Sequence, residues 1–126
     1  MSRPDAIRVH VLAEDLRLRE AARALPNPFE VSFSVSRGEA LEAVKAGAEI
    51  AIIDLDCGGF GVSRDIRDSA RGREVRILMI CSRPEDRWLC RQAGADEVLV
   101  KPILDPSVLT NATQGLMHGI DRAKSQ

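Results

Sequence analysis

The residues best suited to chemistry are three acids and one lysine, each placed directly after an apolar run. Asp54 follows the run at 50–53, Glu14 and Asp15 follow another run near the start of the chain, and Lys101 follows a third. A carboxylate can act as a nucleophile or hold a divalent cation, and a lysine ammonium is a mobile point charge for an anionic oxygen. If these runs are parallel strands, the side chains meet at the sheet edge where α/β proteins bind ligands. The set therefore predicts one candidate site.

Composition limits the kinds of protein that can carry this site. At 126 residues we expect a single domain over 1–126, with a core large enough to fold without metals or disulfides. A net charge of −1, no Tyr, one Trp and three Phe disfavour a nucleic-acid surface. Three cysteines without a Cys-x-x-Cys pair indicate free thiols in a reducing cytoplasm. No apolar run approaches the roughly 20 residues of a membrane span, and the first residues lack a signal-peptide core, so we expect a soluble cytoplasmic protein.

Five short runs have the length and composition of strands. They lie at 7–13, 30–35, 50–54, 76–81 and 97–100. The run at 50–54 is apolar at successive positions, which is typical of a central strand covered on both faces.

Helical patterns follow each of these runs. Helix starts are predicted at Asp15, at the capping box Ser36-Arg37-Gly38-Glu39, at Ser82-Arg83-Pro84-Glu85 and at Asp105-Pro106. The signal for the third helix is weak and covers only about 62–69. The last helix has an apolar stripe that ends at Ile120, and residues 121–126 form a polar tail or the stump of a linker.

Strands that alternate with helices predict an α/β fold with right-handed crossovers. We expect a flavodoxin-like, doubly wound, five-stranded parallel sheet with strand order 2-1-3-4-5 and five helices. In that order the first and third strands are neighbours at the switch point, so Glu14 and Asp15 would face Asp54 across the crevice.

The segment at 93–102 carries a resemblance to a known family. Its Ala93-Gly94-Ala95-Asp96, a short strand and Lys101-Pro102 resemble the signature of the receiver domain of bacterial response regulators. The strand that ends at Asp54 resembles the family's phosphoacceptor strand, and Gly59-Phe60-Gly61-Val62 resembles the start of its third helix. The resemblance covers nearly the whole chain.

This resemblance implies phosphoryl transfer to an aspartate with the help of Mg²⁺. By position, Asp54 would be the phosphoacceptor, and Asp54, Glu14 and the backbone carbonyl of Asp56 would hold Mg²⁺. Lys101 would pair with the phosphoryl oxygens. A divalent cation suits this chemistry because it neutralises the phosphate oxygens under attack.

Several positions depart from the family pattern. The buried face of the first helix aligns Ala13 and Glu14 with the family's two acids, which removes one metal ligand and predicts weakened phosphorylation. Reading the pair as Glu14 and Asp15 instead restores both acids, but it moves Arg19 and Arg23 to core positions. Cys81 takes the place of the usual Thr or Ser and is a weaker donor. Val98 takes the place of the aromatic switch residue.

We therefore expect a signalling and interaction module and not an enzyme. The resemblance implies a histidine kinase or phosphotransfer protein as one partner, and a downstream protein on the face of Trp88, Val98 and the fifth helix. Neither nucleic acid nor a membrane is expected as a partner.

Three other interpretations stay open. The chain could be a pseudo-receiver, a scaffold that works without phosphorylation. Asp54 could merely cap the helix that follows it. The glycine-rich stretch at 57–61 could cradle a phosphate, which would make the chain a small-molecule module for a nucleotide or flavin.

Overall fold

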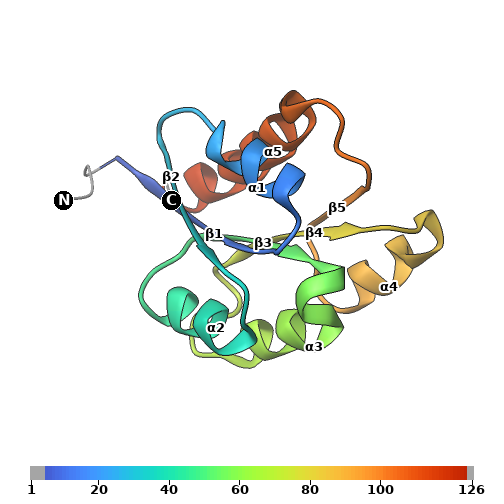
Figure 1. Ribbon diagram of the computed structural model, residues 1–126. Helices are drawn as coiled ribbons and strands as arrows, with labels where there is room; N and C mark the ends of the chain where they lie inside the picture. The colour runs from blue at the N-terminus through green and yellow to red at the C-terminus, as the bar shows by residue number, and fades with distance from the viewer. Residues whose placement is uncertain (1–4, 125–126) are drawn as a thin grey trace.

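The computed structural model of the chain describes residues 5–124, with side chains described for 5–117. Five parallel strands form one sheet in the order β2-β1-β3-β4-β5, which confirms the predicted fold class (Figure 1). The strands are β1 (Ile7–Leu12), β2 (Phe29–Ser34), β3 (Ile50–Asp54), β4 (Arg76–Cys81) and β5 (Glu97–Val100).

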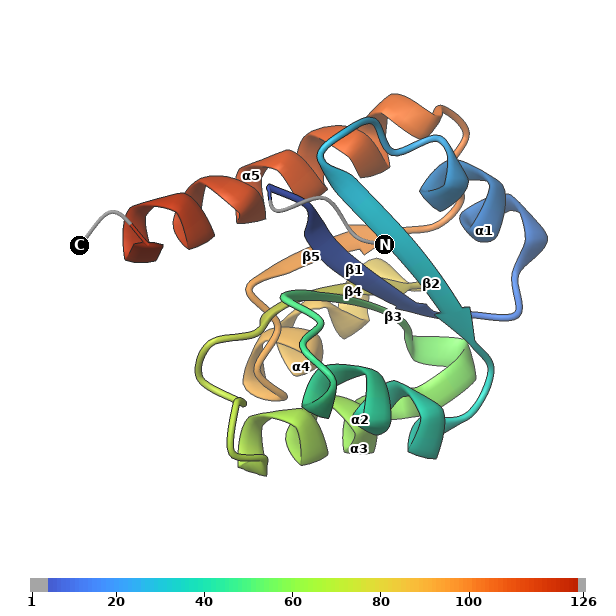
Figure 2. The same ribbon diagram turned by 90° about the vertical axis from the view of Figure 1, so that its left-hand side faces the viewer.

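Helices cover both faces of this sheet, as the crossover rule requires. Helices α1 and α5 lie on one face, and α2, α3 and α4 lie on the other (Figures 1 and 2). The helices are α1 (Leu16–Arg23), α2 (Arg37–Lys45), α3 (Leu55–Asp68), α4 (Arg87–Gln92) and α5 (Pro106–Lys124), with a short 3-10 turn η1 (Pro84–Asp86) before α4. In the part of the chain described, 5–124, none of the helices has the length and apolar character needed to cross a membrane.

Strand β3 is the centre of the molecule. All five of its residues are buried, and its four apolar side chains enter two separate apolar cores. Ile50 and Ile52 pack under α1 and α5, while Ala51 and Ile53 pack under α2 and α3. The absence of alternation in the sequence of β3 follows from this double coverage.

The apolar face of α1 is the predicted one, because Leu18, Ala21 and Ala22 are buried. The arginines on the other faces of this helix stay out of the core. The guanidinium carbons of Arg19 and Arg23 lie 5.3 and 4.9 Å from the ring centre of Phe33 on strand β2. These distances suit cation–π contacts, which keep both charges near solvent.

Helix starts agree with the sequence at three of the four predicted caps, and the first of these is Asp15, whose Oδ1 accepts from the backbone N–H groups of Arg17 and Leu18. Ser36 Oγ accepts a hydrogen bond from the Glu39 backbone N–H, and Asp105 Oδ1 accepts one from Ser107. The predicted cap at Ser82 is wrong, because η1 begins without a side-chain cap and the Ser82 hydroxyl donates to Asp56 instead.

The third helix starts earlier than predicted. The predicted range was about 62–69, but α3 begins at Leu55, directly after β3, and has a kink at Gly59, where φ is 66°. Gly58 lies so close to β1 that an added Cβ would come within 2.5 Å of Leu12 Cδ2. Close packing of the backbone therefore outweighs the low helix propensity of these glycines.

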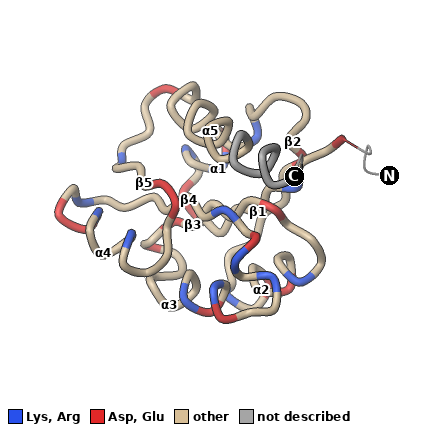
Figure 3. The backbone as a smooth tube through the Cα atoms, turned by 180° about the vertical axis from the view of Figure 1, so that it is seen from behind, with Lys and Arg blue, Asp and Glu red and all other residues tan. Residues whose placement is uncertain are grey.

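The C-terminal helix extends further than expected. It continues through residues 121–124 of the predicted tail, while 125–126 lie outside the described residues, as does the side chain of Ile120. Basic and acidic residues are interleaved along α2 (Figure 3), an arrangement typical of solvated helix surfaces.

Candidate functional site

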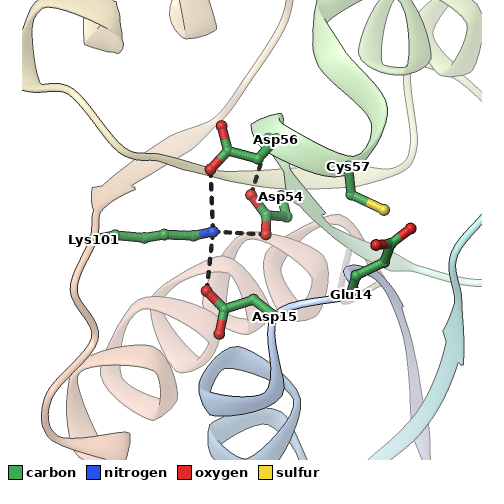
Figure 4. Close-up of a pocket in the computed structure, with 6 residues that line it drawn as sticks. All are labelled: Glu14, Asp15, Asp54, Asp56, Cys57 and Lys101. Carbon is green, nitrogen blue, oxygen red and sulfur yellow. Dashed lines mark hydrogen bonds and ion pairs between the residues drawn. The ribbon is translucent and has the colours of Figure 1, made fainter.

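A small pocket opens at the carboxyl edge of the sheet, beyond β1, β3 and β5. Its volume is about 160 Å³. Figure 4 shows its lining residues, which are Glu14, Asp15, Asp54, Asp56, Cys57 and Lys101. All the charged residues that the sequence assigned to this edge therefore border one cavity, although they come from three different strand ends.

The ammonium of Lys101 lies among three carboxylates. Its Nζ is 2.8 Å from Asp54 Oδ2, 3.1 Å from Asp15 Oδ2 and 3.3 Å from Asp56 Oδ2 (Figure 4). Burial alone would lower the pKa of Lys101, but hydrogen bonds to Asp54 and Asp15 outweigh burial and raise this pKa above its usual range. The lysine is therefore a fixed positive charge in this pocket at neutral pH.

Asp54 has two roles in this arrangement. Its Oδ1 accepts a hydrogen bond from the Asp56 backbone N–H at 3.0 Å, which caps helix α3, and its Oδ2 faces Lys101. The side chain is only 3% exposed. The Asp54 carboxylate therefore caps α3 through one oxygen and belongs to the candidate site through the other, so both interpretations of this residue hold.

Asp15, and not Glu14, is the acid after β1 that meets Lys101. Asp15 Oδ1 accepts from the backbone N–H groups of Arg17 and Leu18 and caps α1, while its Oδ2 contacts the ammonium. The hydrogen bond from Lys101 is the main cause of the lowered pKa of Asp15. Glu14 borders the same pocket but is exposed, and in Figure 4 its carboxylate lies beside Cys57.

Asp56 enters the site through its side chain. Its Oδ2 accepts a hydrogen bond from Ser82 Oγ at 2.6 Å and lies 3.3 Å from Lys101 Nζ. The Ser82 hydroxyl, followed by Lys101, holds the pKa of this carboxyl below its usual value. From the sequence we expected the backbone carbonyl of Asp56 as a metal ligand, its carboxylate only as an added negative charge beside the site, and Ser82 as a helix cap. The position of Ser82 next to the end of β4 was the signal that could have identified it.

Cys81 does not border this pocket. It is fully buried in the core on the α2, α3 and α4 side of the sheet, and its Sγ lies 3.3 Å from the Arg83 carbonyl oxygen. Burial raises the pKa of the Cys81 thiol, and burial also raises that of the neighbouring Cys90 to about 11. Both thiols are therefore protonated at neutral pH, and the hydroxyl at this edge belongs to Ser82.

Cys57 is the only sulfur that borders the pocket in the described part of the chain. Burial, together with the nearby carboxylates of Glu14 and Asp54, raises the pKa of its thiol. A protonated thiol is a poor nucleophile and a poor metal ligand, so Cys57 adds no evident chemistry.

The donor atoms of the pocket fit a hard divalent cation. Carboxylate oxygens are the ligands that Mg²⁺ prefers, and it usually takes only one or two of them together with water and phosphate. Among the residues that the structure describes, no three Asp, Glu, His or Cys side chains form a group that could hold a metal ion by themselves. The pocket is therefore suited to a cation whose remaining ligands are water and substrate oxygens. In this structure the Lys101 ammonium neutralises the same acids.

The residues assigned to the output face lie on β5 and α4. Trp88 is 65% exposed on α4, whereas Val98 is buried in the core beneath that helix. Trp88 can therefore contact a partner directly, and Val98 can act only through its packing.

Comparisons with known proteins support the resemblance. The chain is 26% identical to two uncharacterized response regulatory proteins from two strains of Mycobacterium tuberculosis, over alignments of 125 residues that cover 90% of this chain and 92% of each relative. No protein-family model matches the sequence.

Solved structures with the same fold include a response regulator and a receiver domain. The chemotaxis response regulator CheY4 of Vibrio cholerae superposes with a TM-score of 0.77 and 25% identity, over 88% of this chain and 98% of that one. The receiver domain of the sensor histidine kinase PA1611 from Pseudomonas aeruginosa superposes with a TM-score of 0.76 and 20% identity, over 90% and 98% of the two chains. By its fold and by its similarity to these proteins, the chain fits the CheY-like receiver domains of response regulators.

Proposed function

We propose that the chain receives a phosphoryl group on Asp54, slowly and with the help of Mg²⁺, and passes the signal on by binding another protein. One observation carries the proposal: the nearly buried Asp54 carboxylate is held 2.8 Å from the ammonium of Lys101, a residue 47 positions away in the sequence. A carboxylate that only capped a helix would not need this partner.

The reaction is a displacement at phosphorus. A carboxylate oxygen of Asp54 forms a bond to the phosphorus of a phosphohistidine or of a small phosphodonor, and the bond from phosphorus to the donor nitrogen or oxygen breaks. The leaving group keeps the electron pair of that bond: a small acyl donor leaves as its carboxylate, and a histidine nitrogen leaves as imidazole after taking up a proton from solvent. Asp54 becomes an acyl phosphate, and Lys101 neutralises one of the new anionic oxygens.

Mg²⁺ would bind at the acids on the open side of the pocket. The structural neighbour from Pseudomonas aeruginosa has a magnesium ion in its active-site cleft. In this chain Asp54, with Asp15 or Glu14 and the Asp56 carbonyl, would supply the protein oxygens. Bound there, the ion would neutralise the phosphoryl oxygens during attack.

Two features support a slow reaction. Ala13 is fully buried and has no side-chain oxygen, and Asp15 is already engaged by Lys101 and by the N–H groups at the start of α1. Lys101 already pairs with three carboxylates, and this arrangement must loosen before the ammonium can serve a phosphoryl group.

Intact-mass measurement with acetyl phosphate tests this function. We expect the wild type to gain one phosphoryl group slowly with Mg²⁺ and hardly at all with EDTA. Asp54→Ala should gain none, while Asp68→Asn, a change at the exposed end of α3, should behave as the wild type. Equal labelling of wild type and Asp54→Ala would exclude Asp54 as the acceptor, and rapid stoichiometric labelling of wild type would refute the slow reaction.

A phosphorylation-independent scaffold is the second candidate. The three ion pairs of Lys101 favour it, because they satisfy the pocket with no metal or phosphate. In that case beryllofluoride with Mg²⁺ would shift no backbone amide signal near Asp54.

The partner surface would be the face of α4, β5 and α5. Trp88 is its exposed anchor, and the partners proposed are a histidine kinase or phosphotransfer protein and a downstream protein. Buried, β-branched Val98 has few rotamers, so we expect this face to change little when Asp54 is modified.

A further inference from the structure

The carboxylate of Asp56 borders the pocket, but the proposed reaction gives this side chain no role. Its Oδ2 receives two donors from neighbouring strand ends, Ser82 Oγ at 2.6 Å and Lys101 Nζ at 3.3 Å. Strands β4 and β5 are paired side by side, and this one oxygen therefore joins the segments that follow them. Figure 4 shows the Asp56 and Asp54 carboxylates on adjacent sides of the ammonium.

An oxyanion on Asp54 would need the same donors. It would extend from the Asp54 carboxylate into the space beside Lys101, whose Nζ is already shared between Asp54 and Asp56. The Ser82 hydroxyl donates to the same Asp56 oxygen that contacts Lys101, so this O–H donor is also engaged by the Asp56 carboxylate. A charged Asp56 would also repel a second anion in the same pocket.

We infer that Asp56 is an internal anion that occupies the donors of a phosphoryl group, and that it thereby weakens the binding of oxyanions at Asp54. The inference rests on the proposed function, because it concerns competition for the site of the acyl phosphate. Asp56 is thus a specificity-determining residue: it selects against anions that cannot displace it from Ser82 and Lys101.

The contacts of the Asp56 side chain support this role. The side chain is 59% exposed, yet it has two directed partners, and the hydrogen bond from Ser82 is shorter than an ordinary hydrogen bond between neutral groups.

Titration with beryllofluoride in the presence of Mg²⁺, followed by backbone amide shifts, tests the inference. We expect Asp56→Asn to bind beryllofluoride about fivefold to tenfold more tightly than the wild type, because one like charge is removed from contact distance. Asp68→Asn is the matched control, since it makes the same change in the same helix at an exposed position, and it should bind as the wild type does.

Substitution of Ser82 provides a second test of the inference in the same titration. In the wild-type background Ser82→Ala should change the affinity for beryllofluoride less than twofold, because the hydroxyl serves Asp56. In the Asp56→Asn background the same change should weaken binding severalfold, because the freed hydroxyl now serves the oxyanion. Equal effects of Ser82→Ala in the two backgrounds would contradict the competition.

The outcomes separate the two proposals. If the wild type binds beryllofluoride and Asp56→Asn binds it no more tightly, the inference is overturned and the proposed function stands. If neither protein shows any shift and neither is labelled by acetyl phosphate, the proposed function fails and the inference falls with it.

Discussion

Replacing Lys101 by methionine should destabilise the fold because it removes the charge that neutralises the acids of the pocket. Methionine keeps an unbranched stem of similar reach, so the change is mainly electrostatic. At 2.8 Å, Lys101 Nζ and Asp54 Oδ2 attract each other by about 6 kcal/mol at an effective dielectric constant of about 20, before the cost of desolvation is subtracted. Breaking a buried ion pair costs about 3–5 kcal/mol, and the exposure of Asp15 and Asp56 places the expected loss near the lower end.

The pH dependence gives this prediction a sign. The pKa values of Asp15 and Asp56 are lowered in the folded chain, so their contribution to stability is present above the unfolded value of about 3.9 and is lost as the pH falls through the folded values. The difference in unfolding free energy between wild type and Lys101→Met should therefore be about 3 kcal/mol at pH 7 and should shrink towards pH 3.

Urea unfolding followed by far-UV circular dichroism measures this difference. Lys45→Met is the control, because Lys45 is exposed and lies 3.4 Å from Glu42 on the same helix, a kind of pair worth less than about 1 kcal/mol. If Lys101→Met were as stable as wild type at pH 7, or if its deficit were the same at pH 3, the ion-pair cluster would not contribute as argued.

Two further changes test the packing and protonation of the fold. Burial lowers the pKa of His10, so below pH 6.5 the unfolded chain binds a proton that the folded chain does not bind. The free energy of unfolding should therefore fall by up to about 1.4 kcal/mol for each pH unit below 6.5. In urea titrations from pH 8 to 5, the free energy of unfolding of His10→Asn should depend less on pH than that of the wild type. Gly58→Ala should destabilise by about 1–3 kcal/mol because its Cβ would meet Leu12, whereas Gly38→Ala, with open space around it, should stabilise by up to about 1 kcal/mol; equal effects on thermal unfolding would argue against the close approach of α3 to β1.

The sheet and the apolar face of α1 were predictable because they depend on periodicity over many residues. The burial of Leu18, Ala21 and Ala22 agrees with the expected register of the first helix. The choice between Glu14 and Asp15 was not predictable from that register. Asp15 is the N-cap of α1 and so lies outside the periodic segment that sets the register of the helix. Its short side chain turns back towards the strand end and reaches Lys101, while Ala13 takes the buried position.

Single side-chain directions at strand ends were equally hard to predict. Cys81 and Ser82 are adjacent in the chain, and successive side chains of an extended backbone point in opposite directions. The Cys81 side chain therefore points into the core, and the Ser82 side chain points towards Asp56. The early start of α3 could not be predicted from glycines with low helix propensity, because the close packing of Gly58 against Leu12 is a tertiary effect.

The most direct test of the account is to locate the phosphoryl group itself. The protein is incubated with acetyl phosphate and Mg²⁺, the acyl phosphate is reduced with borohydride, and the reduced aspartate is mapped by peptide mass spectrometry. The account predicts reduction at Asp54 alone, and only when Mg²⁺ was present. Reduction at Asp15 or Asp56, or the same yield at Asp54 in EDTA, would contradict it.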